Sequence, residues 1–191
     1  MANKIKFGLS NVYYAIATIA DDGTATYETP VAIPGAVNIS LDPEGESTPF
    51  YADNIVFFVS TANSGYTGSL EIARVPDSFR TDVLGDVVDG KEVYFEDADA
   101  PTVHFALIFQ FEGDQNATKH VMYNCTATRS AVASETKGAT AEPGTETLDL
   151  TCGMVKNAVL NKNVVKSYCD KPTSQAYASW NTAVYMGTAA G

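Results

Sequence analysis

The stretch VHFALIFQFEGDQNATKHVMYNCTA, residues 103–127, decides the fold class because it predicts two β-strands joined by a polar turn. Pairing Glu112 with Thr118 gives a self-consistent register. Every pair on one face is then apolar or small: Phe109–Val121, Leu107–Tyr123, Phe105–Cys125 and Val103–Ala127. The other face is mixed and carries both histidines, His104 and His120, so we expect it to meet solvent or a neighbour.

The same period of two recurs along the chain. Residues 11–20, rich in Val, Tyr, Ile and Thr, and residues 24–27 after a turn predict two strands. Alternation of apolar and polar residues predicts half-buried strands over residues 37–42, 69–73 and 147–152. The turn signal Asp21-Asp22-Gly23 joins the first two as a hairpin. Residues 55–59 are continuously apolar, which predicts a strand covered on both faces.

One helix is expected. Residues 76–85 begin with Pro76 and Asp77, carry apolar side chains at helical spacing and end at Gly85. A single helix beside many short strands predicts a mostly β protein, a β-sandwich or barrel with one flanking α-helix and long loops.

Two stretches lack such patterning. Residues 42–54 (DPEGESTPFYADN) combine two prolines, four acids and an aromatic pair, and we expect them to form a loop. Long unpatterned loops are usually functional. This one either reaches out to a partner or folds back on its own domain. Residues 130–144 are rich in small and polar residues and predict a second exposed connection.

The chain is acidic. Its 23 acidic and 12 basic residues give a formal net charge of −11, which repels DNA rather than binding it. The three cysteines, Cys125, Cys152 and Cys169, have no CxxC spacing and indicate a reducing environment. Cys125 and Cys152 lie in strand-like runs, where buried free thiols are expected.

No motif predicts catalysis or a cofactor. The sequence has no GxSxG motif, P-loop or GxGxxG motif, and no Cys/His cluster with zinc spacing. The acids Asp42, Glu44 and Glu46 lack the ligand ladder of a calcium loop. Neither a signal peptide nor a membrane-spanning run is visible. We therefore expect no enzyme activity, no cofactor, no metal and no membrane partner.

Several segments are similar, in order, to the major tail (tail tube) proteins of long-tailed, non-contractile bacteriophages of Gram-positive hosts. They are KIKFGLSNVYY (4–14), IPGAVNISLDPEGE (33–46), FYADN (50–54), GYTGSLEIA (65–73), PDSF (76–79), FALIF (105–109), YNCTA (123–127) and TETL (145–148). The resemblance covers residues 4–152. Residues 153–191 depart from it and are expected to form a C-terminal arm or a final strand.

The resemblance implies a structural virion protein. It implies a tail tube β-sandwich domain over residues 1–152, hexameric rings that stack into a tube, and DNA that passes through the lumen without specific binding. The partners implied are further copies of the chain and the tape measure, distal tail and tail terminator proteins. The place implied is the virion tail, assembled in the host cytoplasm. The acidity then fits a lumen wall that DNA does not stick to, although an acidic outer wall has the same composition.

The resemblance also gives the segment 42–54 a role as the contact between subunits or rings. Its candidate contact residues are Asp42, Pro43, Glu44, Glu46, Pro49, Phe50, Tyr51, Asp53 and Asn54. Tyr177 and Trp180 are possible contacts from the C-terminal arm. Phe50 and Tyr51 are the expected anchors, since aromatic residues dominate interface energetics.

Two other classes of function compete with this one. A carbohydrate- or protein-binding β-sandwich module of a tail tip or surface adhesin has similar composition, and differs in staying a monomer or small oligomer. A small hydrolase on a β-scaffold needs a convergent acid/base pair, which the sequence does not indicate.

Overall fold

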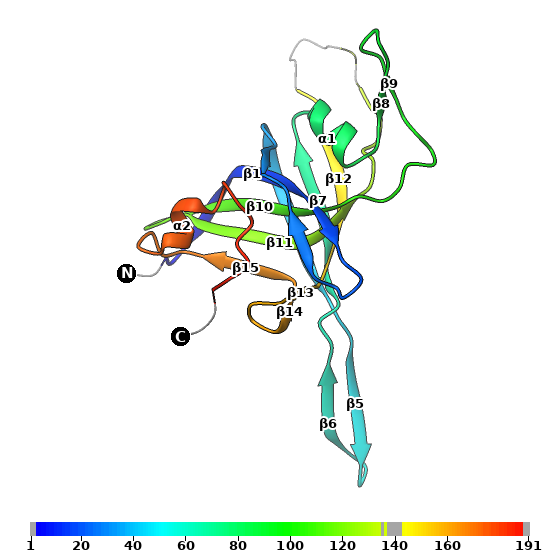
Figure 1. Ribbon diagram of the computed structural model, residues 1–191. Helices are drawn as coiled ribbons and strands as arrows, with labels where there is room; N and C mark the ends of the chain where they lie inside the picture. Colours follow the sequence, from blue (N-terminus) through cyan, green and yellow to red (C-terminus); the bar gives the residue numbers. More distant parts are fainter. Residues whose placement is uncertain (1–2, 135, 137–142, 189–191) are drawn as a thin grey trace.

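The computed structural model describes residues 3–134, 136 and 143–188, and within them the protein is mostly β. Its main sheet has nine antiparallel strands in the order β2-β1-β10-β11-β12-β7-β4, with β3 paired to β1 and β15 to β11 (Figure 1). The two end strands, β2 and β4, do not pair with each other, so the sheet is not a closed barrel. The strands of this sheet are β1 (Lys6–Ile19), β2 (Ala25–Tyr27), β3 (Val31–Ala32), β4 (Ala36–Glu44), β7 (Gly65–Ile72), β10 (His104–Gly113), β11 (Thr118–Ala127), β12 (Glu146–Gly153) and β15 (Lys166–Cys169).

The remaining elements are three two-stranded ribbons and two short helices. They are β5 (Ser47–Ala52) with β6 (Ile55–Thr61), β8 (Val87–Val88) with β9 (Tyr94–Phe95), β13 (Val155–Asn157) with β14 (Lys162–Val164), α1 (Asp77–Asp82) and α2 (Gln175–Ser179). The strands predicted over residues 11–20, 24–27, 37–42, 69–73 and 147–152 are confirmed as β1, β2, β4, β7 and β12. The connection predicted over residues 130–144 lies partly outside the described residues.

The predicted 103–127 hairpin exists as β10 and β11, but its register is only partly right. Phe105 pairs with Cys125 as predicted. Toward the turn the register shifts by one, so that Phe109 lies opposite His120. The predicted pairs Leu107–Tyr123, Phe109–Val121 and Glu112–Thr118 are therefore wrong. The cause is a bulge that places one extra residue in β11 opposite Ala106, and no sequence periodicity marks it.

The bulge coincides with a change of partner on the other edge of β11. Residues Asn124–Ala127 pair with β12, whereas residues Lys119–Met122 pair with β15. The sheet bends here, and β12, β7 and β4 pack back over β1, β10 and β11 around the main core. This core contains Tyr14, Leu70, Phe105 and Leu148, one from each of four strands, each at most 1% exposed.

Helix α1 closes one end of the main core. The predicted helix is confirmed, although it is shorter than residues 76–85. Its Phe79 is 1% exposed and meets Tyr14 and Phe105 edge-to-face, with ring centroids 5.0 and 5.5 Å apart. Such edge-to-face pairs stabilise beyond their buried area. Cys125 and Cys152 are buried free thiols, as predicted, and burial raises the pKa of Cys125.

The second face of the β10–β11 hairpin is also buried, contrary to the expectation that it meets solvent or a neighbour. Ala106, Ile108, Val121 and Tyr123 form a second core there with side chains of the C-terminal segment. Trp180 is the largest side chain that the C-terminal segment contributes, and it is 3% exposed. Its Nε1 donates to the His120 carbonyl at 3.2 Å.

The C-terminal segment, residues 153–191, thus packs on the sheet of the same chain through β15 and through the side chains around Trp180. Tyr177 Oη donates to the Ala117 carbonyl at 2.9 Å. Trp180 and Tyr177 therefore contact their own chain, and Trp180 has too little exposed surface to act as an inter-subunit contact. Helix α2 precedes Trp180 and was not predicted, because five residues are too few to set a helical period.

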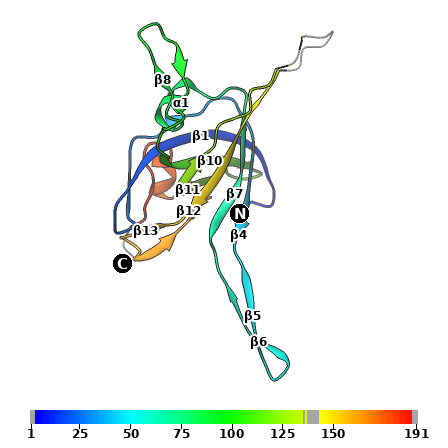
Figure 2. The ribbon, with the colours of Figure 1, turned by 90° about the vertical axis from the view of Figure 1, so that its right-hand side faces the viewer.

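Two ribbons project from the body at opposite ends. In both views β5–β6 extends far below the main sheet, while β8–β9 rises above it beside α1 (Figures 1 and 2).

Replacing Phe79 by Ala should lower the free energy of unfolding by about 3–5 kcal/mol, because it leaves a cavity between Tyr14 and Phe105. Phe57→Ala is the matched control. Phe57 is 69% exposed, so its loss should change stability by less than about 0.5 kcal/mol. Urea unfolding followed by far-UV circular dichroism measures both, and equal losses would contradict the assignment of Phe79 to the core.

Candidate functional site

The segment 42–54, predicted as a loop, is β-structure. Asp42, Pro43 and Glu44 end β4, and Pro49, Phe50 and Tyr51 lie in β5, which pairs with β6. The prolines hide the strand pattern, yet Pro43 is tolerated because β4 is an edge strand. Glu46 lies between β4 and β5. The structure therefore corrects the loop to the end of an edge strand and one arm of a ribbon.

A two-residue turn forms the tip of the β5–β6 ribbon. Asp53 and Asn54 have φ values of 52° and 63°, and they connect the paired residues Ala52 and Ile55. Positive φ at both central residues is the type I′ geometry of tight hairpins, which Asp and Asn tolerate. An Asp-Asn pair between two apolar runs was the sequence signal that could have predicted this hairpin.

The ribbon exposes apolar side chains on both strands. Seven of them are between 47% (Val59) and 69% (Phe57) exposed: Phe50, Tyr51, Ile55, Val56, Phe57, Phe58 and Val59. The prediction that residues 55–59 are covered on both faces is therefore wrong for the single chain, since the described residues leave both strands open to solvent. Phe50 pairs with Phe58 and Tyr51 with Val56, and a bulge at Phe57 separates the two pairs.

A second exposed apolar surface lies on β8–β9. Its exposed side chains are Val87, Val88, Val93, Tyr94 and Phe95, between 40% and 56% exposed. Arg129 anchors both ends of this hairpin, pairing with Asp86 before β8 and with Glu96 after β9. Its Nη2 also donates to the Leu84 carbonyl at 2.7 Å. The hairpin is thus fixed in direction although its apolar side chains face solvent.

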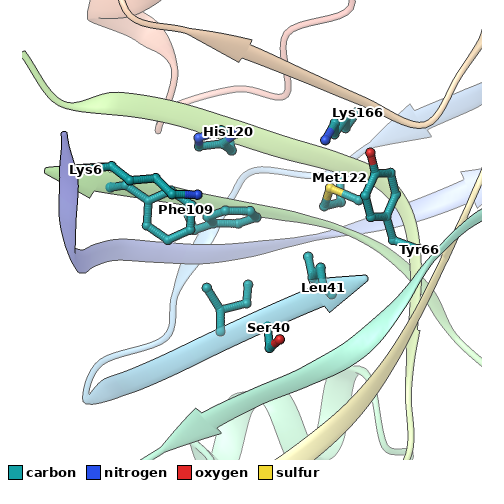
Figure 3. Close-up of a pocket in the computed structure, with 10 residues that line it drawn as sticks. Lys6, Ser40, Leu41, Tyr66, Phe109, His120, Met122 and Lys166 are labelled. Carbon is teal, nitrogen blue, oxygen red and sulfur yellow. The ribbon is translucent and has the colours of Figure 1, made fainter. Parts of the chain in front are cut away.

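A pocket of about 320 Å³ opens between β4 with β7 and the hairpin β10–β11 (Figure 3). Its lining combines apolar and cationic side chains: Lys6, Ile39, Ser40, Leu41, Tyr66, Phe109, Phe111, His120, Met122 and Lys166. Lys6 Nζ lies 5.1 Å from the Phe111 ring centroid, and Lys166 Nζ lies 4.4 Å from that of Tyr66. Neither ammonium has a carboxylate within ion-pair distance among the residues that the structure describes.

His120 forms part of the pocket wall. Its ring stacks on Phe109 with centroids 5.2 Å apart. Burial, with a smaller contribution from the positive charges of Lys166 and Lys6, lowers the pKa of His120 from 6.5 to about 4. The imidazole is therefore neutral at pH 7.

The two histidines lie on opposite faces of the β10–β11 hairpin, not on one face as predicted, because of the bulge in β11. His104 Nδ1 lies 2.7 Å from Asn124 Oδ1. Within the described residues no three His, Cys, Asp or Glu side chains gather as metal ligands do. No helix in that part of the chain has the length and apolarity to cross a membrane.

No protein-family model matches the chain, and no curated protein matches it either.

The low pKa of His120 predicts a specific loss of stability in acid. As the pH falls below about 6.5 the unfolded chain binds a proton on this imidazole, whereas the folded chain does not until about pH 4. The free energy of unfolding should therefore fall across this window. His120→Phe keeps an aromatic ring against Phe109 and removes the titration, so its stability should fall less than that of the wild type.

Urea unfolding at about pH 7 and about pH 4.5 compares the two proteins. The control is His104→Asn, which leaves His120 in place and should therefore keep the loss of stability that His120 causes. An equal loss in the wild type and in His120→Phe would show that His120 is not held neutral by the fold.

Proposed function

We propose that this chain is the structural subunit of a long-tailed bacteriophage tail tube, which self-assembles into stacked rings through which DNA is ejected. The observation that carries the proposal is the β5–β6 ribbon, whose apolar side chains are exposed on both strands. The ordered resemblance of residues 4–152 to major tail proteins implies that this assembly is a tube of stacked rings. In this proposal the bent sheet is the tail tube β-sandwich.

The ribbon is unlike an ordinary surface element. Contiguous exposed apolar patches on monomers are small, and larger ones mark interaction sites. An isolated two-stranded hairpin is marginally stable in water, because it has no third layer on which to pack. Burial of these seven half-exposed side chains by a partner would contribute on the order of 1 kcal/mol each. A second chain is therefore the missing layer of this ribbon.

The placement of the two apolar ribbons favours an open or cyclic assembly. β5–β6 and β8–β9 lie at opposite ends of the molecule (Figures 1 and 2). Contacts made by different surfaces of each copy are heterologous, and such contacts generate rings or filaments rather than closed dimers. Hexameric rings that stack into a tube are the form that the resemblance implies.

The charge and the partners fit the same proposal. A net charge of −11 on each copy makes a ring strongly acidic, which disfavours the adhesion of DNA passing through its lumen. Tape measure, distal tail and tail terminator proteins would meet the tube along its lumen and at its ends. The virion tail, assembled in the host cytoplasm, is the proposed location.

The alternative is a carbohydrate- or protein-binding module of a tail tip. Electron microscopy of the purified protein separates the two proposals. A tail tube subunit should form rings or tubes at high concentration, or once a tail initiator complex is supplied. Protein that stays monomeric under both conditions would remove the tail tube proposal.

The double variant Phe50→Ala with Tyr51→Ala should abolish tube formation and leave the folded monomer with near-normal thermal melting. Both rings are more than half exposed, so their loss costs the monomer little. In an assembly the lost contact recurs at every subunit. Val159→Ala with Leu160→Ala, which also removes two exposed apolar side chains, is the control and should assemble. Normal tubes from the Phe50/Tyr51 variant would place the contact surface elsewhere.

Duplex DNA binding should be undetectable at about 0.15 M salt, because few cations are available to displace counterions from phosphate. A gel-shift assay checks this. Micromolar affinity would contradict a lumen that DNA slides through without binding.

A further inference from the structure

We infer that the tip of the β5–β6 ribbon of one copy binds in the lysine-flanked pocket between β4 and β10–β11 of another copy. This inference rests on the proposed self-assembly and names the surface that receives the ribbon. Three observations support it: the charges of the tip and the pocket, the apolar side chains of both, and the length of the ribbon.

The charge pattern of the ribbon is unusually simple. Between residues 47 and 61 the only charged side chain is Asp53, at the turn. Ile55 lies next to the turn on β6, and Tyr51 lies one residue away from it on β5. Their side chains are 62% and 63% exposed. The ribbon tip is thus one carboxylate surrounded by large apolar side chains.

The pocket has the complementary pattern. Its inner wall is apolar, with Phe109 and Met122 at most 5% exposed. Lys6 and Lys166 approach it from opposite sides, with His120 between them (Figure 3). Both lysines stand over aromatic rings rather than beside carboxylates in the described part of the chain, although acids outnumber bases 23 to 12 overall. Two cations that have no carboxylate partner among the described residues, placed around an apolar hollow, match a single carboxylate on an apolar tip.

The other exposed surface, β8–β9, is a poorer receptor for this tip. The segment 86–99 contains six acids and one lysine: Asp86, Asp89, Glu92, Glu96, Asp97, Asp99 and Lys91. Asp53 would meet like charge there, which disfavours the contact. Charge therefore selects the pocket.

The ribbon cannot fill the pocket of its own chain. β4 forms one wall of the pocket, and β5 continues from β4 away from the body (Figures 1 and 2). The six residues of β5 place the tip roughly 20 Å beyond the end of β4. The tip therefore reaches only the pocket of a neighbouring copy.

Charge reversal on both sides tests the inference. Asp53→Lys places a lysine tip against a lysine pocket, and Lys6→Glu with Lys166→Glu places an aspartate tip against a glutamate pocket. Each variant alone should need about tenfold or more protein to form tubes, as measured by light scattering and electron microscopy. An equimolar mixture should assemble near the wild-type concentration, because each tip then finds an opposite charge in the pocket of the other variant.

Lys162→Glu with Lys171→Glu is the control, since it makes the same change of net charge at two exposed lysines outside the pocket. It should assemble as the wild type does. Circular dichroism and thermal melting establish that every variant is folded.

The outcomes separate the two proposals. If the wild type assembles and the pocket variant assembles equally well, or if the mixture does not restore assembly, the pocket is not the receptor and the tail tube proposal stands. If the wild type never assembles, both fail. A small anionic molecule retained in this pocket by the purified monomer, seen by native mass spectrometry and lost on Lys6→Glu with Lys166→Glu, would also overturn the inference.

Discussion

Strand β11 changes its hydrogen-bonding partner halfway along its length, and the rest of the structure depends on that change. Asn124–Ala127 pair with β12, while Lys119–Met122 pair with β15. The bulge that accompanies the change bends the sheet, so that β12, β7 and β4 cover one face of the β10–β11 hairpin. The C-terminal segment covers the other face, with Trp180 at its centre. One hairpin buried on both faces therefore packs against segments from the N-terminal strand β1 to the C-terminal segment around Trp180.

The contrast between this hairpin and the β5–β6 ribbon has a direct physical meaning. Both are apolar on both faces, yet only β10–β11 has layers above and below it. Apolar surface without a covering layer is unfavourable in water, and a second chain is the remaining way to supply that layer. The same apolarity that makes a core in one place leaves an exposed apolar surface in the other. For this reason we propose that the first serves folding and the second serves assembly.

The charges beside the apolar surfaces distinguish one possible contact between copies from the others. The chain as a whole is acidic, which by itself keeps copies apart. Lys6 and Lys166 create a local exception beside an apolar pocket, and Asp53 is the single charge at the end of the ribbon. In the assembly that we propose, general repulsion combined with this one attractive pairing would favour a unique orientation between neighbouring copies over non-specific aggregation.

The sequence by itself determined much of the local structure, although it predicted residues 42–54 as a loop and did not predict α2. Strand-forming composition located β1, period-two alternation located β4, β7 and β12, and the Pro-Asp start with a terminal Gly85 located α1, because these signals are local in the chain. The composition of residues 42–54 also indicated Phe50 and Tyr51 as candidate contact residues. Only the tertiary structure decided what these elements meet. The bulge in β11, the burial of Trp180 and the pocket at Lys6 and Lys166 all depend on residues distant in the chain, and no pattern in a short window records such contacts. An apolar run such as residues 55–59 has the same sequence pattern in a core and on a projecting ribbon, since its exposure is decided by the presence of another layer.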